Sequence, residues 1–139
     1  QKLDDDGQRD NTLVILIGDN GRCMPRGKQF LYDGGISIPL LMRWPGHIKP
    51  QTVCDDLVNT LDICKTIVDL AGVKPPHPLH GLNLFSDEIK NRTYIFAARD
   101  KMDDTHDAMR AVRSKRYKYS RNLMPERAYC QYNEYKEKR

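Results

Sequence analysis

A short aliphatic run, Leu13-Val14-Ile15-Leu16-Ile17, restricts the fold of this chain more than any other sequence feature. A continuous run of β-branched and aliphatic residues is typical of a strand buried on both faces of a parallel sheet. The run ends at Gly18-Asp19-Asn20-Gly21, which is a turn signal. Because ligands in open α/β sheets bind just beyond the carboxyl ends of strands, Asp19 and Asn20 are candidate site residues.

The remaining pattern predicts an α/β domain followed by a small α+β piece. Residues 36–44 are apolar and indicate a second strand despite the proline within them. Residues 57–70 carry apolar side chains at helical spacing, and Gly72 fits the position after the helix end. Residues 94–98 predict a short strand, and residues 109–112 and 117–119 predict a hairpin around Ser114-Lys115.

Charge and cysteine usage narrow the classes of protein. Residues 109–139 hold ten Lys/Arg and three Asp/Glu, a net charge of +7, and the remainder carries −3. Such a basic end suits an anionic partner or is simply a solvated surface, and the second interpretation is favoured for the last ten residues. No apolar run is long enough to span a membrane.

The cysteines form no C-x-x-C pair, which argues against a zinc ribbon, and Cys64 is expected as a small core residue of the predicted helix.

Two groups of residues are able to carry chemistry. Asp19 and Asn20 offer hard oxygen ligands of the kind that calcium and magnesium prefer, although Asx residues also favour turns for structural reasons. Lys28 precedes Tyr32-Asp33-Gly34-Gly35, and the neighbouring glycines let backbone and ammonium approach an anion closely. An exposed loop lysine is the structural alternative, so each group alone is ambiguous.

Taken together, the motifs resemble the type I sulfatases, which are formylglycine-dependent enzymes of alkaline-phosphatase-like fold. The resemblance is strongest over residues 11–84. It continues through residues 95–100 and 113–119, where it is similar to a subgroup that acts on carbohydrate sulfates. It implies the late part of the sulfatase catalytic domain at residues 1–84 and a truncated C-terminal subdomain at 85–139. The strings that carry it are Asn11-Thr12-Leu13-Val14, Gly18-Asp19-Asn20-Gly21, Gly27-Lys28, Tyr32-Asp33-Gly34-Gly35, Pro39 and Arg43-Trp44-Pro45-Gly46, followed by Leu61-Asp62, Leu70-Ala71-Gly72 and Gly81.

The resemblance implies roles for particular residues. Asp19 and Asn20 take the positions that complete a calcium site, and Lys28 takes that of the lysine contacting the substrate sulfate. The implied activity is sulfuric ester hydrolysis on a sulfated small molecule or glycan, in an extracytoplasmic location. The polar segment 99–106 is either a solvated loop or part of a sugar pocket, and its candidate contacts are Arg99, Asp103 and His106.

The chain departs from the family pattern at the nucleophile. Sulfatases make formylglycine from the cysteine of a C-x-P-x-R motif, and Cys23-Met24-Pro25-Arg26-Gly27 places Gly27 where the final arginine belongs. This segment also follows the Asp-Asn pair, which is the wrong place for the nucleophile. We therefore expect the formylglycine, the family's early aspartate pair and its catalytic histidines in an upstream segment, and we expect this chain alone to be inactive.

Two other classes compete with this interpretation. A phosphatase or phosphodiesterase of the same superfamily holds transition metals through histidine ligands, whereas Asn20 favours an oxygen-only site. A basic nucleic-acid-binding module is the non-enzymatic alternative, because residues 113–121 interleave basic side chains with Tyr117 and Tyr119. Tyrosines at alternate positions also suit the packed face of a hairpin, so no nucleic-acid partner is expected.

Overall fold

The computed structural model describes residues 1–102 and 105–127. The chain divides into two compact units, Gln1–Cys54 and Asp55–Arg139. The predicted domain boundary between residues 84 and 85 concerns the parent sulfatase fold and stays a prediction. Within the described ranges no helix is long and apolar enough to cross a membrane.

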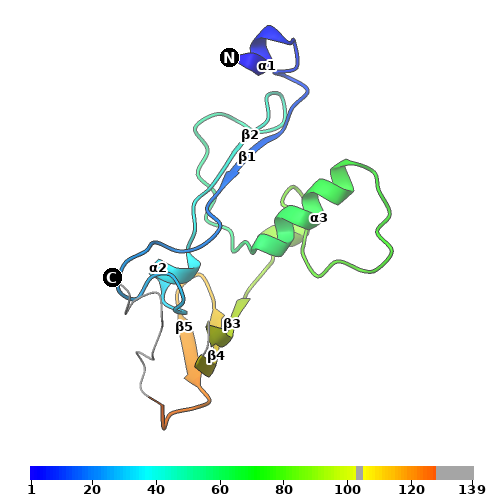
Figure 1. Ribbon diagram of the computed structural model, residues 1–139. Coiled ribbons are helices and arrows are strands. Elements are labelled where there is room, and N and C mark those ends of the chain that lie inside the picture. Colours follow the sequence, from blue (N-terminus) through cyan, green and yellow to red (C-terminus); the bar gives the residue numbers. More distant parts are fainter. Residues whose placement is uncertain (103–104, 128–139) are drawn as a thin grey trace. The chain divides into compact units, whose positions relative to one another are not determined.

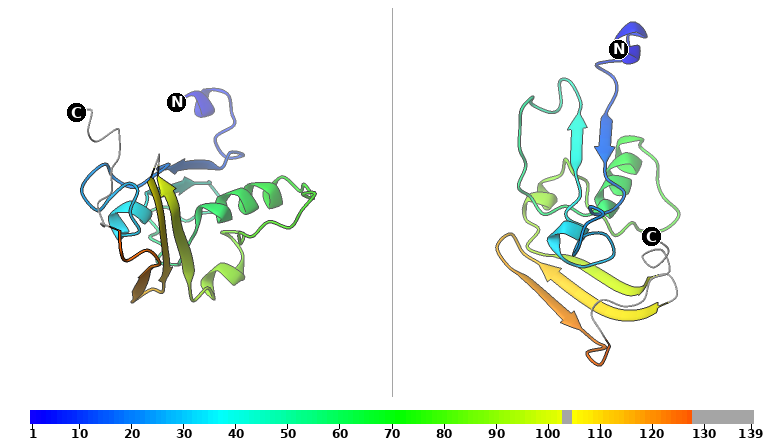
Figure 2. Two further views of the ribbon diagram at one scale, coloured as in Figure 1. Left: turned by 60° about the horizontal axis from the view of Figure 1, so that its bottom comes forward. Right: turned by 60° about the vertical axis from the view of Figure 1, so that its left-hand side comes forward.

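The first unit is built around a two-stranded sheet. Its elements are α1 (Lys2–Asp5), β1 (Val14–Ile17), α2 (Asp33–Ile36) and β2 (Leu40–Arg43). β1 and β2 pair in antiparallel register, and the right-hand view of Figure 2 shows their arrows pointing in opposite directions. Both predicted strands are confirmed in position. β2 begins only at Leu40 because Ile36 belongs to α2 and Pro39 has no N–H to donate to a ladder.

The prediction of a parallel, doubly buried first strand is wrong for this pairing. The strand beside β1 in the first unit runs antiparallel to it, and Leu16 and Leu41, which face each other in the register, are 64% and 57% exposed. An uninterrupted apolar run indicates a strand that is meant to be covered, but it says nothing about the direction of the partner strand.

The described part of the second unit contains two helices and a three-stranded antiparallel sheet (Figure 1). The elements are α3 (Thr60–Leu70), α4 (Asp87–Lys90), β3 (Ile95–Met102), β4 (Thr105–Arg113) and β5 (Lys118–Asn122), with the sheet order β3-β4-β5. The predicted hairpin is confirmed, and its turn is closed by a 2.8 Å hydrogen bond from the backbone N–H of Ser114 to the carbonyl of Tyr117. Tyr117 and Tyr119 are exposed, so the expected packing of these rings is not found in the described part of the unit.

A capping box fixes the start of α3 at Thr60 rather than at residue 57. The Asn59 side chain accepts a hydrogen bond from the Leu61 N–H at 3.1 Å, and the Asp62 carboxylate accepts one from the Asn59 N–H at 2.6 Å. This reciprocal arrangement satisfies two N–H groups that the helix itself leaves without partners. Gly72, with φ +65°, follows the helix end as predicted.

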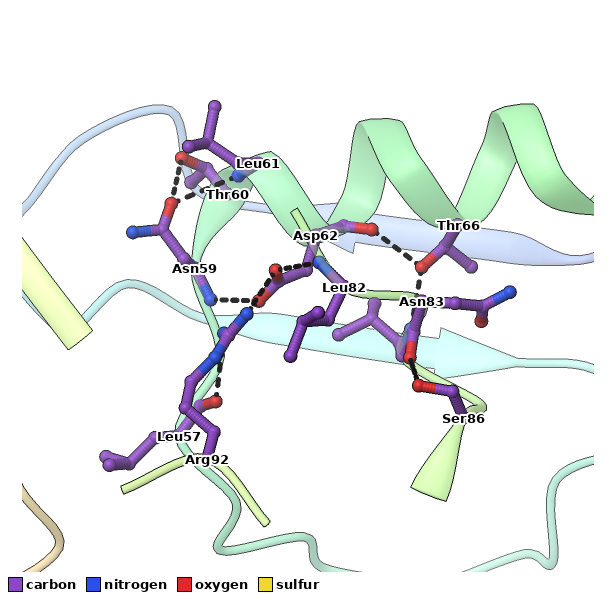
Figure 3. A network of polar contacts seen from close by, with 11 residues as sticks. Leu57, Asn59, Thr60, Leu61, Asp62, Thr66, Leu82, Asn83, Ser86 and Arg92 are labelled. Carbon is purple, nitrogen blue, oxygen red and sulfur yellow. Dashed lines mark hydrogen bonds and ion pairs between the residues drawn. The ribbon is translucent and has the colours of Figure 1, made fainter. Parts of the chain in front are cut away.

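Asp62 is also the centre of a buried polar network (Figure 3). Its side chain is fully buried, and Arg92 pairs with it in a two-pronged contact whose Nη2–Oδ1 distance is 2.8 Å. The same carboxylate accepts a 2.8 Å hydrogen bond from the Leu82 N–H, and the Thr66 hydroxyl accepts one from the Leu84 N–H at 2.8 Å. These bonds fix the segment around residues 81–84 to the helix.

The helix therefore buries polar residues and exposes apolar ones. Asp62 and Thr66 are its buried residues, whereas Leu61 and Ile67 are more than half exposed. Cys64, expected in the core, is exposed within the described residues. The prediction was wrong because helical spacing identifies an apolar stripe but not which side of the helix the neighbouring segment hydrogen-bonds to.

We expect Asp62→Asn to destabilise the full-length protein by about 3–5 kcal/mol at pH 7, because the buried Arg92 guanidinium loses its counter-charge. Burial raises the pKa of Asp62, but the Arg92 guanidinium and the Leu82 and Asn59 N–H groups outweigh it and hold the pKa below its usual value. This contribution to stability is present above the unfolded pKa of about 3.9 and is lost as the pH falls through the lower folded pKa.

Urea unfolding of wild type and variant from pH 7 to pH 3 measures both effects. The stability difference should be constant at neutral pH and shrink below about pH 4. Lys90→Gln, which breaks the exposed Lys90–Asp87 pair, is the matched control and should leave stability within experimental error. Equal stability of wild type and Asp62→Asn at pH 7 contradicts the account.

Candidate functional site

The loop of residues 18–36 carries all three residues with the best-defined predicted roles, Asp19, Asn20 and Lys28. It folds back on itself through hydrogen bonds from the Arg22 N–H to the Gly34 carbonyl at 3.1 Å and from the Lys28 N–H to the Arg22 carbonyl at 2.8 Å. The second bond joins Lys28 to a residue two positions beyond Asn20. The backbone of Lys28 therefore lies beside the segment that follows the Asp-Asn pair.

Glycines make this folding possible because backbone meets backbone inside the loop. A Cβ atom at Gly21 would lie 2.4 Å from the Gly34 carbonyl oxygen, and one at Gly27 would lie 2.0 Å from the Arg22 oxygen. At Gly35 a Cβ would lie 2.0 Å from the Phe30 oxygen. No side chain fits at these distances, so the loop requires glycine at all three positions.

A small apolar anchor holds the middle of the loop. Phe30 and Leu31 are buried, and the Phe30 N–H donates a 3.0 Å hydrogen bond to the Gly27 carbonyl. α2 forms the last part of the loop, beginning at Asp33, and the Ser37 N–H donates a 2.8 Å hydrogen bond to the Asp33 carbonyl. The loop is therefore a packed structure with exposed polar side chains, a form that holds functional groups in place.

The three predicted side chains are accessible to a ligand. Asp19 and Lys28 are exposed, and Asn20 is half-buried. None of the ion pairs within the described part of the chain includes Asp19 or Lys28. A carboxylate, an amide oxygen and an ammonium group thus emerge from one compact loop without being neutralised by its other described residues.

The donor chemistry of Asp19 and Asn20 fits part of a calcium site. Calcium takes about six to eight oxygen ligands, and a carboxylate with a neighbouring amide oxygen provides two of the right kind. Residues 1–102 and 105–127 contain no group of three or more His, Cys, Asp or Glu side chains arranged to hold a metal ion. Because two oxygen donors are fewer than calcium takes, a calcium site that included Asp19 and Asn20 would need further ligands.

The second predicted group is the set of candidate sugar contacts, Arg99, Asp103 and His106. Arg99 is largely buried and pairs with the buried Asp107, with a distance of 3.2 Å between Arg99 Nε and Asp107 Oδ2. His106 is exposed, and its carbonyl accepts a 2.8 Å hydrogen bond from Arg127. Asp103 lies outside the described residues. The ion pair gives Arg99 a structural role between the paired strands β3 and β4, and sugar contact by this group stays a prediction.

Two further cations of the loop, Arg22 and Arg26, were not predicted as site residues from the sequence. Arg26 lies within residues 23–27, which lack the final arginine of the nucleophile motif. Its left-handed backbone, with φ +59°, has no sequence signature in a residue that carries a side chain. The only available signal was the presence of two arginines within six positions of the predicted sulfate contact.

The chain has clear relatives among known proteins. Residues 26–137 match the family described as N-sulphoglucosamine sulphohydrolase, C-terminal. The chain is 38% identical over 140 residues to an ulvan-active sulfatase of Formosa agariphila, a match that covers 99% of this chain and 23% of that protein. It is 34% identical over 98 residues to human N-acetylgalactosamine-6-sulfatase, covering 60% of this chain and 19% of the relative. It is 37% identical over 98 residues to human arylsulfatase A, covering 59% and 18%.

The chain therefore belongs to the type I sulfatase family, in which residues 26–137 form the N-sulphoglucosamine sulphohydrolase C-terminal region. The resemblance predicted from the motifs is confirmed. The chain spans less than a quarter of the length of each of these three relatives. Its α/β elements and two sheets agree with such a region.

We expect Gly35→Ala to destabilise the full-length protein by about 3 kcal/mol, because the new Cβ would displace backbone at the Phe30 oxygen. Gly46→Ala is the control. A Cβ there meets nothing within 4 Å, so the cost is the left-handed φ of +77° alone, about 1 kcal/mol. Urea unfolding measures the difference, and equal losses in the two variants contradict the close approach.

Proposed function

We propose that the protein carrying this chain is a sulfatase that hydrolyses a sulfate ester of a carbohydrate, and that this chain supplies part of its calcium and sulfate site. The observation that carries the proposal is the loop of residues 18–36, which presents Asp19, Asn20 and Lys28 from one glycine-packed structure. Membership of the sulfatase family supports the reaction class.

Each residue has a distinct role in the proposed reaction. The Lys28 ammonium binds an oxygen of the substrate sulfate as a compact positive charge. Asp19 and Asn20 contribute oxygen ligands to calcium, which when bound polarises the sulfate. Both effects oppose negative charge on the sulfate oxygens and matter most where that charge grows in the transition state.

The nucleophile is proposed to come from outside this chain. Cys23 is exposed, but Gly27 occupies the position of the arginine in the formylglycine motif. Cys23 should therefore remain an unmodified thiol, and this chain alone should not turn over an aryl sulfate. The complete protein is proposed to have the alkaline-phosphatase-like fold with formylglycine in its catalytic part.

The names of two relatives support a carbohydrate substrate. One is an ulvan-active sulfatase and the other an N-acetylgalactosamine-6-sulfatase, and both names describe sulfated sugars.

An extracytoplasmic location is proposed with this substrate class, since sulfated polysaccharides are large, charged molecules. A phosphatase of the same superfamily would be recognised by faster turnover of phosphate than of sulfate esters.

We expect Asp19→Ala in the full-length enzyme to weaken calcium binding by at least about tenfold, because a charged ligand oxygen is lost. Metal content by mass spectrometry and calcium titration of the apo-enzyme provide the measurement. Asp10→Ala, at an exposed carboxylate before β1, is the matched control and should bind calcium as wild type does. Unchanged metal content in Asp19→Ala would remove this residue from the site.

We expect Lys28→Ala to reduce kcat/KM on a sulfate ester by about ten- to a hundredfold, the effect of losing one charge-assisted contact of about 1.5–3 kcal/mol. The melting temperature should not change, because the exposed ammonium has no ion pair in the described chain. Lys49→Ala, an exposed lysine after β2, should match wild type. Wild-type kinetics in Lys28→Ala, or a loss explained by unfolding, would contradict the assignment.

A further inference from the structure

Two exposed arginines, Arg22 and Arg26, lie in the same loop as Lys28 and have no role in the reaction proposed above. The Lys28 N–H is hydrogen-bonded to the Arg22 carbonyl at 2.8 Å, and Arg26 precedes Lys28 by two residues. Three cationic side chains therefore emerge from one closed turn of backbone, residues 22–28. Neither arginine takes part in an ion pair among the described residues.

Arg26 has a backbone conformation that disfavours any residue with a side chain. Its φ of +59° lies in the left-handed region, which glycine adopts without strain. Its guanidinium carbon lies 5.4 Å from the centroid of the Tyr32 ring, which is within the range of a cation–π contact. Gln29 in the same loop also has a left-handed backbone, with φ +83°, so what distinguishes Arg26 is an exposed cation beside an aromatic ring.

Arg22 is positioned by backbone rather than by a ring. A Cβ atom at Gly34 would lie 3.0 Å from Arg22 Nε and 3.3 Å from its Nη2, so the guanidinium lies directly against that glycine. The Arg26 carbonyl oxygen is 3.3 Å from the same point. The Arg22 guanidinium and the Arg26 carbonyl thus both lie against Gly34.

We propose that Arg22 and Arg26 bind a second acidic group of the substrate, a carboxylate or a second sulfate, beside the sulfate ester that Lys28 contacts. A guanidinium group matches a planar or tetrahedral oxyanion with two parallel hydrogen bonds, whereas an ammonium group acts as a point charge. The loop would therefore select polyanionic carbohydrates over sulfate esters with no other charge. This inference rests on the proposed sulfatase function.

Matched substrates test the proposal in the full-length enzyme. The first is a monosulfated disaccharide that contains a uronate, and the second is the methyl ester of that uronate. The third is a disaccharide of uncharged sugars that carries two sulfate groups. Wild type should prefer the uronate, the disulfated compound or both over the methyl ester. The charged substrate that is preferred identifies which acidic group the arginines bind.

The variants are Arg22→Gln, Arg26→Gln and Arg26→Gly. Each should lower kcat/KM on the preferred charged substrate by about tenfold, mainly through KM, and change the methyl ester by less than about twofold. Arg26→Gly also relieves the left-handed backbone, so its melting temperature should equal or exceed that of wild type. Arg43→Gln, an exposed arginine of β2, is the control and should behave as wild type on all three substrates.

Equal effects of the arginine variants on charged and esterified substrates, or no effect on either, would overturn the inference. So would a wild type that does not discriminate between these substrates while hydrolysing all of them, and that result would leave the sulfatase function intact. A wild type that hydrolyses no sulfate ester would overturn the proposed function and this inference with it.

Discussion

The geometry of the candidate site depends on three places where the backbone of one loop touches itself. Gly21, Gly27 and Gly35 each stand where a Cβ atom would come within 2.0–2.4 Å of another backbone atom. These contacts close residues 18–36 into a packed loop, and the closure places the backbone of Lys28 beside the segment that follows Asp19 and Asn20. Conformational freedom is removed before any ligand arrives, which reduces the entropy that binding has to oppose.

The second unit depends on a different interaction, the buried pair of Asp62 and Arg92. One carboxylate completes the capping box of α3, receives the Arg92 guanidinium and holds the Leu82 backbone. The helix consequently faces its connector with hydrogen-bonding groups, and Gly81 allows that approach because a Cβ there would lie 2.2 Å from the Leu61 oxygen. Removing either partner would leave the other charge buried and unpaired, which makes this pair costly to break.

The ends and turns of the helices and strands could be predicted from the sequence. The segments that each element pairs with or packs against could not. The strand end at Gly18, the helix end at Gly72 and the hairpin turn at Ser114 follow from short-range signals, and the structure has all three. The antiparallel partner of β1 and the exposed Cys64 depend on contacts between distant segments, which hydrophobic spacing does not encode. For the site, motif resemblance predicted Asp19, Asn20 and Lys28, but no pattern indicated the left-handed backbone of Arg26.

The central claim is that this loop delivers calcium ligands and a sulfate contact to one place. A crystal structure of the full-length enzyme with calcium and a bound sulfate measures this directly. The account predicts calcium at about 2.3–2.6 Å from side-chain oxygens of both Asp19 and Asn20. It also predicts Lys28 Nζ at about 2.7–3.2 Å from an oxygen of the anion. Calcium bound without these two residues, or a Lys28 side chain directed away from the sulfate, would contradict it.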